Sequence, residues 1–280
     1  MVDSIKAAPK TVRIQGETVA LCFFEASTRT RLSFQTASIR MGLGPLVFES
    51  GSHTSLEKGE TIEDSLLNIA AMMPRLIVVR CGDDVNLRHL ASQVKMPLVN
   101  AGWGQRGHPT QALLDSYTLY SAWGGFSQKK LLIVGDLKHS RVVASHLELF
   151  SSLGLEIGQC GPAEFLLPGS QIRSFSTLEK GLEWADAVMA LRFQFERHEA
   201  KAAFSRGDYH LEFGLKSSSL RFLKSDGLIL HPGPINHGIE LESQVLSDPR
   251  SRVLEQVSNG VYVREAIMRT ILGDAREGAL

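Results

Sequence analysis

The chain has 280 residues, of which 43% are hydrophobic and 21% charged, and its 30 basic and 30 acidic side chains give a formal net charge of zero at pH 7. This balance offers no electrostatic basis for binding nucleic acid or an anionic membrane, no apolar run is long enough to span a bilayer, and the N-terminus lacks the pattern of a signal peptide. Cys22, Cys81 and Cys160 are widely spaced and odd in number, so we expect buried free thiols in a reducing cytoplasm rather than disulfides or a metal site.

The first half of the chain alternates β-rich runs with segments whose apolar residues recur at helical spacing. We expect strands at residues 18–24, 46–49, 76–80 and 97–100, and helices at residues 30–41, 61–72, 84–94 and 109–123. This alternation is typical of a parallel sheet whose strands are connected by crossover helices. Gly124 and Gly125 then interrupt the pattern.

A second series of similar build follows. Strands are expected at residues 131–136, 156–160, 187–192 and 228–231, and helices at residues 141–153 and 261–272. We therefore predict an α/β fold of two domains, residues 1–120 and 121–260, each a parallel β-sheet flanked by helices and joined near residues 117–125. The active site is expected in the cleft between them, because open α/β sheets bind ligands at the carboxyl ends of their strands.

The most informative motif, EASTRTR at residues 25–31, follows the first predicted strand. It places hydroxyl and guanidinium groups where a buried strand ends and a helix begins. The first N–H groups of a helix lack internal partners and carry partial positive charge, and Arg29 adds a planar fork that fits phosphate oxygens. The motif therefore predicts a phosphate site. The alternative interpretation is an ordinary capped helix with surface arginines.

Other polar side chains also follow predicted strands. They are Arg80, His108, Lys138, Arg141, Arg192 and the HPGP segment at residues 231–234. Taken singly, Arg80 could equally be a strand-end charge that reaches water, and Arg192 could form a surface ion pair with Glu196 or Glu199. An isolated histidine is more often structural than functional. Their common placement at strand ends is nevertheless what a cleft between two sheets requires.

Two further motifs, HPTQALLD at residues 108–115 and HPGPIN at residues 231–236, follow EASTRTR in a fixed order. With these motifs the chain resembles the aspartate/ornithine carbamoyltransferase family over about residues 16–272. The resemblance implies a carbamoyl phosphate-binding domain at residues 1–120 and an amino acid-binding domain at residues 121–260, with the C-terminal helix (residues 261–280) packed back on the first. It implies no metal or cofactor, because positioning and electrostatics supply the acceleration.

The resemblance also implies the roles of the residues that bind carbamoyl phosphate. The loop of residues 27–30 would cradle the phosphate. Thr30, Arg80 and His108 would point at the carbonyl oxygen, and Gln111 would hold the NH₂ group. The carbamoyl phosphate-binding residues would be Ser27, Thr28, Arg29, Thr30, Ser55, Arg80, His108, Gln111, Pro232 and Gly233. The catalytic residues would be Arg29, Thr30, Lys58, Arg80 and His108.

The segment SLEKGET at residues 55–61 resembles the family's mobile loop, whose serine and lysine enter the active site of the neighbouring subunit. The resemblance therefore implies a homotrimer with shared active sites, in which Ser55 and Lys58 complete the site. The alternative is a solvated polar loop with a helix cap at Thr61. A dihydroorotase or a regulatory subunit is a candidate partner, since relatives join such chains.

The amine acceptor is indicated by RFQFER at residues 192–197, which resembles the Arg-x-Gln-x-Glu-Arg segment of aspartate carbamoyltransferases. Arg192 would grip one carboxylate bidentately with Gln194 beside it, and Lys138 and Arg141 would bind the second. The aspartate-binding residues would be Lys58, Lys138, Arg141, Arg192, Gln194, Gly233 and Pro234. The HPGP segment stands where an ornithine enzyme would carry a reactive cysteine, which favours aspartate.

The implied reaction transfers the carbamoyl group of carbamoyl phosphate to the amine of L-aspartate, giving N-carbamoyl-L-aspartate and phosphate, an early step of pyrimidine synthesis in the cytoplasm. One alternative is a carbamoyltransferase for ornithine or an acylated ornithine. Another is a weakly active relative that serves as an assembly subunit. Three departures from the family motivate the last alternative. Trp103 stands where aspartate is usual, His237 stands where arginine is common, and the N-terminal segment is short. The short segment predicts an apolar stripe on the C-terminal helix that is either exposed or covered by a partner.

Overall fold

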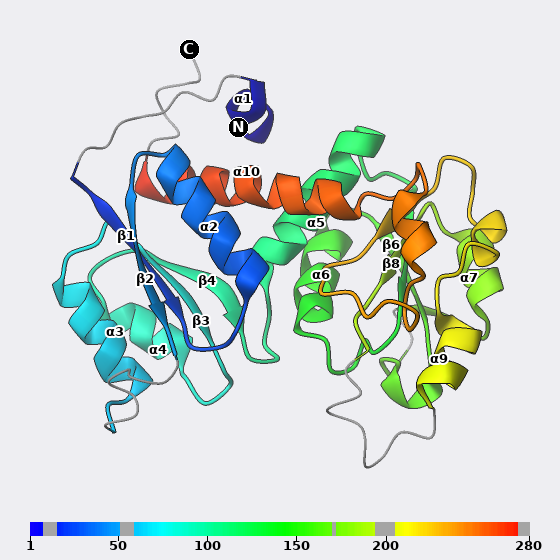
Figure 1. The fold of residues 1–280 in the computed structure, drawn as a ribbon, viewed down its shortest axis with the longest axis horizontal. Helices are drawn as coiled ribbons and strands as arrows, with labels where there is room; N and C mark the ends of the chain where they lie inside the picture. Colours follow the sequence, from blue (N-terminus) through cyan, green and yellow to red (C-terminus); the bar gives the residue numbers. More distant parts are fainter. Residues whose placement is uncertain (8–15, 51–58, 170–171, 194–204, 274–280) are drawn as a thin grey trace. The chain divides into compact units, whose positions relative to one another are not determined.

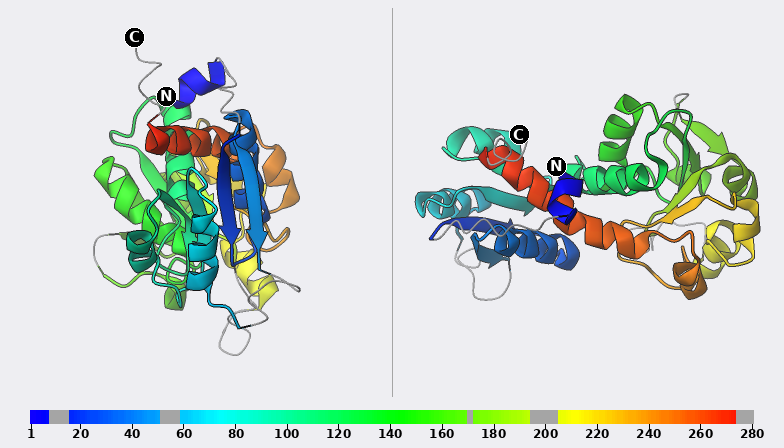
Figure 2. Two further views of the ribbon diagram at one scale, coloured as in Figure 1. Left: turned by 90° about the vertical axis from the view of Figure 1, so that its left-hand side faces the viewer. Right: turned by 90° about the horizontal axis from the view of Figure 1, so that it is seen from above.

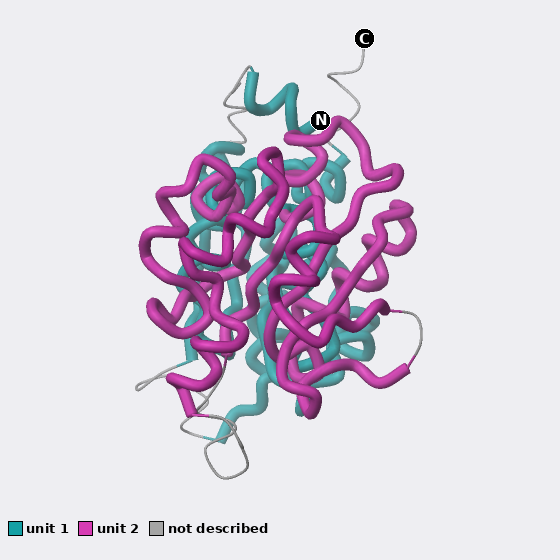
Figure 3. The backbone as a smooth tube through the Cα atoms, turned by 90° about the vertical axis from the view of Figure 1, so that its right-hand side faces the viewer, with its two compact units in different colours: residues 1–114, 257–280 teal, residues 115–256 magenta. Residues whose placement is uncertain are grey.

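The computed structural model describes residues 1–7, 16–50, 59–169, 172–193 and 205–273. The chain forms two compact units, one made of Met1–Leu114 with Val257–Leu280 and the other of Asp115–Gln256 (Figure 3). Each unit contains one parallel β-sheet with helices on both of its faces (Figure 1 and Figure 2). The predicted fold class is therefore confirmed, because the alternation of strand and helix patterns produces parallel strands joined by crossover helices.

The first unit has a four-stranded sheet of order β2-β1-β3-β4, in which every neighbouring pair is parallel. Its strands are β1 (Thr18–Phe23), β2 (Gly44–Glu49), β3 (Ile77–Cys81) and β4 (Leu98–Trp103). Its helices are α1 (Val2–Ala7), α2 (Thr28–Arg40), α3 (Ile62–Ala71), α4 (Leu87–Gln93), the start of α5 (Pro109–Trp123) and most of α10 (Val253–Leu272).

Successive side chains of β1 pack alternately in the two hydrophobic cores of this unit, because strand side chains alternate between the faces of a sheet. Leu21 packs in one core with Phe34 of α2 and Met268 of α10. Cys22 packs in the other core with residues of α3 and α4, among them Leu66. The two pairs of helices thus cover opposite faces of the first sheet.

The second unit has a five-stranded parallel sheet of order β7-β6-β5-β8-β9. Its strands are β5 (Lys130–Val134), β6 (Glu156–Cys160), β7 (Arg173–Phe175), β8 (Ala187–Ala190) and β9 (Leu228–Leu230). Its helices are the rest of α5, α6 (Arg141–Ser152), α7 (Leu178–Trp184) and α9 (Arg206–Phe213), with the 3₁₀ helices η2 (Ala163–Phe165), η3 (Ser219–Phe222) and η4 (Ser243–Ser247). Ile133 of β5 packs with α5 and α6, whereas Val134 packs with α7 and α9.

The start of the last helix was wrong in the sequence-based prediction, because α10 begins at Val253 rather than at residue 261. Asn259 and Gly260, directly in front of residue 261, have low helix propensity. In the fold, the buried side chain of Asn259 accepts a hydrogen bond from Lys6, and a Cβ at Gly260 would lie 2.7 Å from Nη1 of Arg264. Tertiary packing therefore outweighs local propensity in this helix.

Several short elements were not predicted. They are α1, β7, α7 and α9, which have six, three, seven and eight residues. Segments of this length contain too few turns or alternations to show a clear period. The bounds of longer elements differ by a few residues, as at α4, which begins at Leu87 after the N-cap Asn86 rather than at residue 84.

The N-terminal helix α1 lies against α10, as Figure 1 also shows. Lys6 donates a 2.6 Å hydrogen bond to Asn259, and its ammonium lies 5.5 Å from the ring centroid of Tyr262. The short segment thus covers part of the C-terminal helix. Leu254 and Val257 at the start of α10 remain exposed.

A buried polar network lies where α5 and α10 enter the second unit. Asp115 accepts a 2.7 Å hydrogen bond from Nε2 of Gln256 and lies 2.8 Å from Nε2 of His146. Gln256 in turn accepts a 2.9 Å hydrogen bond from the backbone N–H of His231. Asp115 and His146 are fully buried, so their polar atoms depend on partners within the protein.

We expect Asp115→Ala to lower the free energy of unfolding by about 3 kcal/mol, because it leaves buried polar atoms of His146 and Gln256 without their acceptor. Chemical denaturation measures this loss. Asp226→Ala, which removes an exposed carboxylate of the same unit, is the matched control and should change the free energy by less than about 0.5 kcal/mol. Equal effects of the two substitutions would contradict the role given to the network.

Candidate functional site

The strand order reverses once in each sheet, between β1 and β3 in the first and between β5 and β8 in the second. The carboxyl ends of strands at such a reversal are where open α/β sheets bind ligands. Half of the predicted site residues lie at or after the ends of these four strands. They are Ser27, Thr28, Arg29, Thr30, Arg80, Lys138, Arg141 and Arg192.

The loop after β1 ends at the N-terminus of α2. Ser27 is the N-cap residue, yet within the described residues its side chain makes no capping hydrogen bond. Thr28 and Arg29 in the first turn are exposed, whereas Thr30 is 5% exposed. The first N–H groups of a helix have no hydrogen-bond acceptor within the helix, and here the cap hydroxyl does not bind them either. Such a helix start can bind an anion such as phosphate.

The loops after β1 and β4 meet at His108. Its Nε2 lies 3.5 Å from Oγ1 of Thr30, and its Nδ1 lies 3.5 Å from Oγ1 of Thr110. His108 is 5% exposed, and its carbonyl accepts a 3.0 Å hydrogen bond from the N–H of Gln111 in the first turn of α5. The structure thus brings together Thr30, His108 and Gln111, which the resemblance predicts to face the carbonyl and NH₂ groups of carbamoyl phosphate. Thr110 is an additional neighbour of the imidazole.

Arg80, near the end of β3, is held in a buried position. Its Nη1 donates a 3.4 Å hydrogen bond to the carbonyl of Ala101, and its Nε lies 3.7 Å from Oε2 of Glu25. Gly102 has a φ of +129°, and a Cβ there would lie 2.8 Å from Nη1 of Arg80. Glycine is therefore required beside this guanidinium. The contact with Glu25 was not predicted, although this residue opens the EASTRTR motif.

The loop after β5 carries the predicted Lys138 and Arg141. Asp136 is 3% exposed, accepts a 3.1 Å hydrogen bond from the N–H of His139 and lies 2.9 Å from Nδ1 of that residue. The backbone N–H of Lys138 donates to the carbonyl of Phe165. These bonds fix the loop while the Lys138 side chain stays exposed, and Arg141 begins α6.

Arg192 follows β8, and the HPGP segment follows the neighbouring β9. The N–H of Leu191 donates a 2.8 Å hydrogen bond to the carbonyl of Val134 at the end of β5. Nδ2 of Asn236 donates a 3.1 Å hydrogen bond to the carbonyl of Phe193, directly after Arg192. The second unit therefore places Lys138, Arg192, Pro232, Gly233 and Pro234 on the loops at the carboxyl ends of three adjacent strands, and Arg141 in the first turn of the helix after one of these loops.

Ser55, Lys58 and Gln194 lie outside the described residues, so their roles stay predictions. The cleft predicted between the two domains also stays a prediction.

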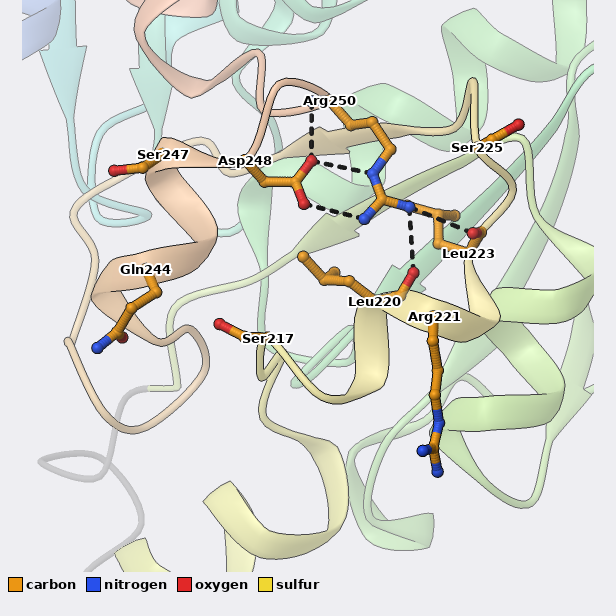
Figure 4. A pocket seen from close by; sticks show the side chains of 9 residues that line it. All are labelled: Ser217, Leu220, Arg221, Leu223, Ser225, Gln244, Ser247, Asp248 and Arg250. Atoms are coloured by element: carbon orange, nitrogen blue, oxygen red, sulfur yellow. Dashed lines mark hydrogen bonds and ion pairs between the residues drawn. The ribbon is translucent and has the colours of Figure 1, made fainter.

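A pocket elsewhere in the second unit is lined by residues of η3, η4 and the loops beside them (Figure 4). Arg250 forms a two-point ion pair with Asp248 and donates hydrogen bonds to the carbonyls of Leu220 and Leu223. Hydrogen bonds from Arg250 hold the pKa of Asp248 below its usual value. Since none of the predicted site residues lines this pocket, these contacts serve the loops rather than the candidate site.

The two unusual side chains near the motifs have structural partners. Trp103 is 7% exposed, and its indole N–H donates a 2.8 Å hydrogen bond to the carbonyl of Val85. It packs in the core with α3 and α4. His237 is exposed, and its Nδ1 lies 3.0 Å from the hydroxyl of Ser243.

All three cysteines are buried and free, as predicted. Burial raises the pKa of Cys22, Cys81 and Cys160 to about 12 in each case. Among the described residues, no three His, Cys, Asp or Glu side chains are grouped so that they could hold a metal ion. In the same part of the chain, no helix is both long enough and apolar enough to cross a bilayer.

Comparison with known families identifies the chain. Residues 1–121 match the model of the aspartate/ornithine carbamoyltransferase carbamoyl-P binding domain, and residues 127–271 match that of the Asp/Orn binding domain. The chain belongs to the aspartate/ornithine carbamoyltransferase family. The resemblance seen in the sequence motifs is therefore confirmed.

Relatives and solved structures agree with membership of the carbamoyltransferase family. The aspartate carbamoyltransferase catalytic subunit of Gemmatimonas aurantiaca is 40% identical over 98% of this chain and 86% of its own length. That of Myxococcus xanthus is 42% identical over 96% of this chain and 93% of its own length. The fold is similar to aspartate transcarbamoylase from Trypanosoma cruzi in complex with carbamoyl aspartate and phosphate, with a TM-score of 0.85, 28% identity and coverage of 96% and 88%.

We expect the three thiols to react slowly in the native protein, because the thiolate is the reactive form and burial suppresses it. Each folded pKa of about 12 lies above the value of 9.0 for a free thiol, so the folded state binds more protons above pH 9. Stability is therefore expected to fall as the pH rises from 9 toward 12. Titration with a chromogenic disulfide measures how fast the thiols react, with the denatured chain as the control. Rapid modification of the native protein would contradict the slow reaction expected of buried thiols.

Proposed function

We propose that this chain transfers the carbamoyl group of carbamoyl phosphate to the amine of L-aspartate, releasing N-carbamoyl-L-aspartate and phosphate in pyrimidine biosynthesis. The observation that carries the proposal is the grouping of cationic residues at the strand reversal of the second sheet. Lys138 and Arg141 follow β5, and Arg192 follows the adjacent β8. Two cationic points suit the two carboxylates of aspartate, whereas the side-chain ammonium of ornithine needs an acidic receptor.

The first unit supplies the donor site in this proposal. Arg29 and the N-terminus of α2 neutralise the phosphate, whose charge grows as it leaves. Thr30, Arg80 and His108 donate hydrogen bonds to the carbonyl oxygen as it gains negative charge. The side-chain carbonyl of Gln111 accepts from the carbamoyl NH₂ group, with Ser27 and Thr28 completing the phosphate cradle. The close approach of Thr30 to His108 supports this assignment.

The second unit supplies the acceptor site. Arg192 and Gln194 bind one carboxylate of aspartate, and Lys138 and Arg141 bind the other. Carbonyl groups of the HPGP segment accept hydrogen bonds from the substrate amine. The amine must attack as the neutral base, so these acceptors hold it near the carbonyl carbon.

The same proposal extends to the assembly of the enzyme. The carbamoyl phosphate domain corresponds to residues 1–120 with the C-terminal helix, and the aspartate domain to residues 121–260. The enzyme is a cytoplasmic homotrimer in which Ser55 and Lys58 reach the active site of the neighbouring subunit. A dihydroorotase or a regulatory subunit remains a candidate partner. Mass measurement in solution, with and without co-purifying proteins, tests the assembly.

Carbamoyl transfer from radiolabelled carbamoyl phosphate, assayed with aspartate, ornithine and acylated ornithine, tests the reaction. The expected product is labelled N-carbamoyl-L-aspartate, with ornithine inactive. Turnover of ornithine without turnover of aspartate would overturn the choice of substrate. Binding of a bisubstrate phosphonate analogue without any turnover would instead identify an assembly subunit.

Two substitutions separate the donor and acceptor sites. We expect Arg29→Ala to lower kcat/KM for carbamoyl phosphate by roughly 100- to 1,000-fold, because it removes a charged donor that binds the leaving phosphate. Arg192→Ala should instead raise the KM for aspartate by roughly 100-fold, because a bidentate contact is lost. Steady-state kinetics with each substrate varied measure both effects.

Arg31→Ala is the matched control for Arg29, since Arg31 lies in the same motif but forms a 2.8 Å ion pair with Glu49. Its kinetics should stay within roughly threefold of the unmutated chain, because this ion pair already neutralises Arg31. If Arg31→Ala and Arg29→Ala were equally damaging, the phosphate role of Arg29 would be wrong.

A further inference from the structure

His231 is a buried histidine to which the mechanism above gives no role. It is 2% exposed and stands at the start of the HPGP segment, directly after β9. Its Nδ1 accepts a 2.8 Å hydrogen bond from the backbone N–H of Gly233. A nitrogen that accepts this bond carries no proton, so the neutral imidazole must carry its proton on Nε2.

Glu240 favours the same arrangement of the ring proton. Its Oε1 lies 3.3 Å from Nε2 of His231, and its side chain is 1% exposed. At this distance the carboxylate stabilises the tautomer that carries a proton on Nε2 and destabilises the tautomer that has a lone pair there. The same oxygen accepts a hydrogen bond from the backbone N–H of Asn236. Glu240 thus contacts both the beginning and the end of the loop.

The loop is also tied to its surroundings at both ends. The backbone N–H of His231 donates a 2.9 Å hydrogen bond to the buried Gln256. Nδ2 of Asn236 donates to the carbonyl of Phe193, next to Arg192. With both ends fixed, the direction of the peptide groups between them depends on the contact with the His231 ring.

The contact with Gly233 sets the direction of a carbonyl group. The N–H of Gly233 belongs to the same planar peptide unit as the carbonyl of Pro232, and in a trans unit the two groups point in opposite directions. Because the N–H points at the buried His231 ring, the Pro232 carbonyl points away from that ring. Gly233 itself has a φ of +68°, a conformation that glycine adopts without strain.

We propose that His231, with its tautomer fixed by Glu240, is a positioning residue that aims the Pro232 carbonyl at the substrate amine. This inference rests on the proposed function, in which the HPGP segment binds that amine. His231 acts through the backbone of Gly233 and does not itself contact the substrate. Its removal should therefore weaken the use of aspartate more than the binding of carbamoyl phosphate, because most of the residues proposed to bind carbamoyl phosphate lie in the first unit.

Two isosteric substitutions test this role. In His231→Asn, the side-chain oxygen occupies the place of Nδ1 and can accept from the N–H of Gly233. In His231→Gln, the terminal polar atoms reach only the place of Nε2. We expect His231→Asn to keep kcat/KM for aspartate within roughly threefold, and His231→Gln to lower it roughly tenfold through KM, because one hydrogen bond is lost. The KM for carbamoyl phosphate should change less than that for aspartate in both variants.

Thermal unfolding separates positioning from simple loss of stability, because each substitution removes one contact of the imidazole: His231→Asn the contact with Glu240, and His231→Gln the hydrogen bond from Gly233. Thr177→Ala is the matched control: it removes the N-cap of α7 in the same unit, where the threonine side chain accepts from the N–H of Lys180. It should lower stability without changing the KM for aspartate. If activity followed the unfolding temperature across all three variants, with asparagine and glutamine equally damaging, the positioning role would be overturned.

The tautomer gives a readout that is independent of activity. In ¹⁵N-labelled protein, the imidazole signals that disappear in His231→Asn should show an unprotonated Nδ1 and a protonated Nε2. A proton on Nδ1 would overturn the inference. An unmutated chain that does not carbamoylate aspartate would instead overturn the proposed function and, with it, the role of His231 toward that amine.

Discussion

Parallel pairing of the central strands is the constraint on which the proposed donor site of the first unit and the proposed acceptor site of the second unit both depend. A backbone hydrogen bond of 2.8 Å joins the N–H of Phe24 to the carbonyl of Arg80, so β1 and β3 end side by side. An equivalent bond joins Leu191 to Val134 at the ends of β5 and β8. Because the strands are parallel, every following loop leaves from the same edge of its sheet. Polar residues far apart in sequence therefore gather at that edge.

The charges of the chain are used differently inside and outside these loops. Arg75, Arg250 and Lys224 form ion pairs with nearby carboxylates, which neutralise them locally. Arg29 and Lys138, by contrast, pair with no carboxylate among the described residues. A chain with a net charge of zero can thus still present cationic groups to phosphate and carboxylate ligands, because no carboxylate of the described residues neutralises these two side chains.

The loops that carry the candidate residues are supported by buried polar groups. Asp136 holds the loop before α6 through His139, and Glu240 holds the HPGP segment through His231 and Asn236. Such groups are costly to bury unless they are hydrogen-bonded, so their contacts restrict the loop to one conformation. Rigid support of this kind keeps donors and acceptors in place for a reaction that relies on positioning.

The sequence by itself determined the alternation of strands and helices, the two-unit α/β fold and the family, because apolar periodicity and the EASTRTR, HPTQALLD and HPGPIN motifs are local patterns. It also placed Arg80 and His108 at strand ends. Only the tertiary structure decided that α10 begins at Val253, that Glu25 faces Arg80 and that Trp103 packs in a core. These features depend on contacts between residues distant in the chain, and such contacts leave no period or spacing in the sequence that could reveal them.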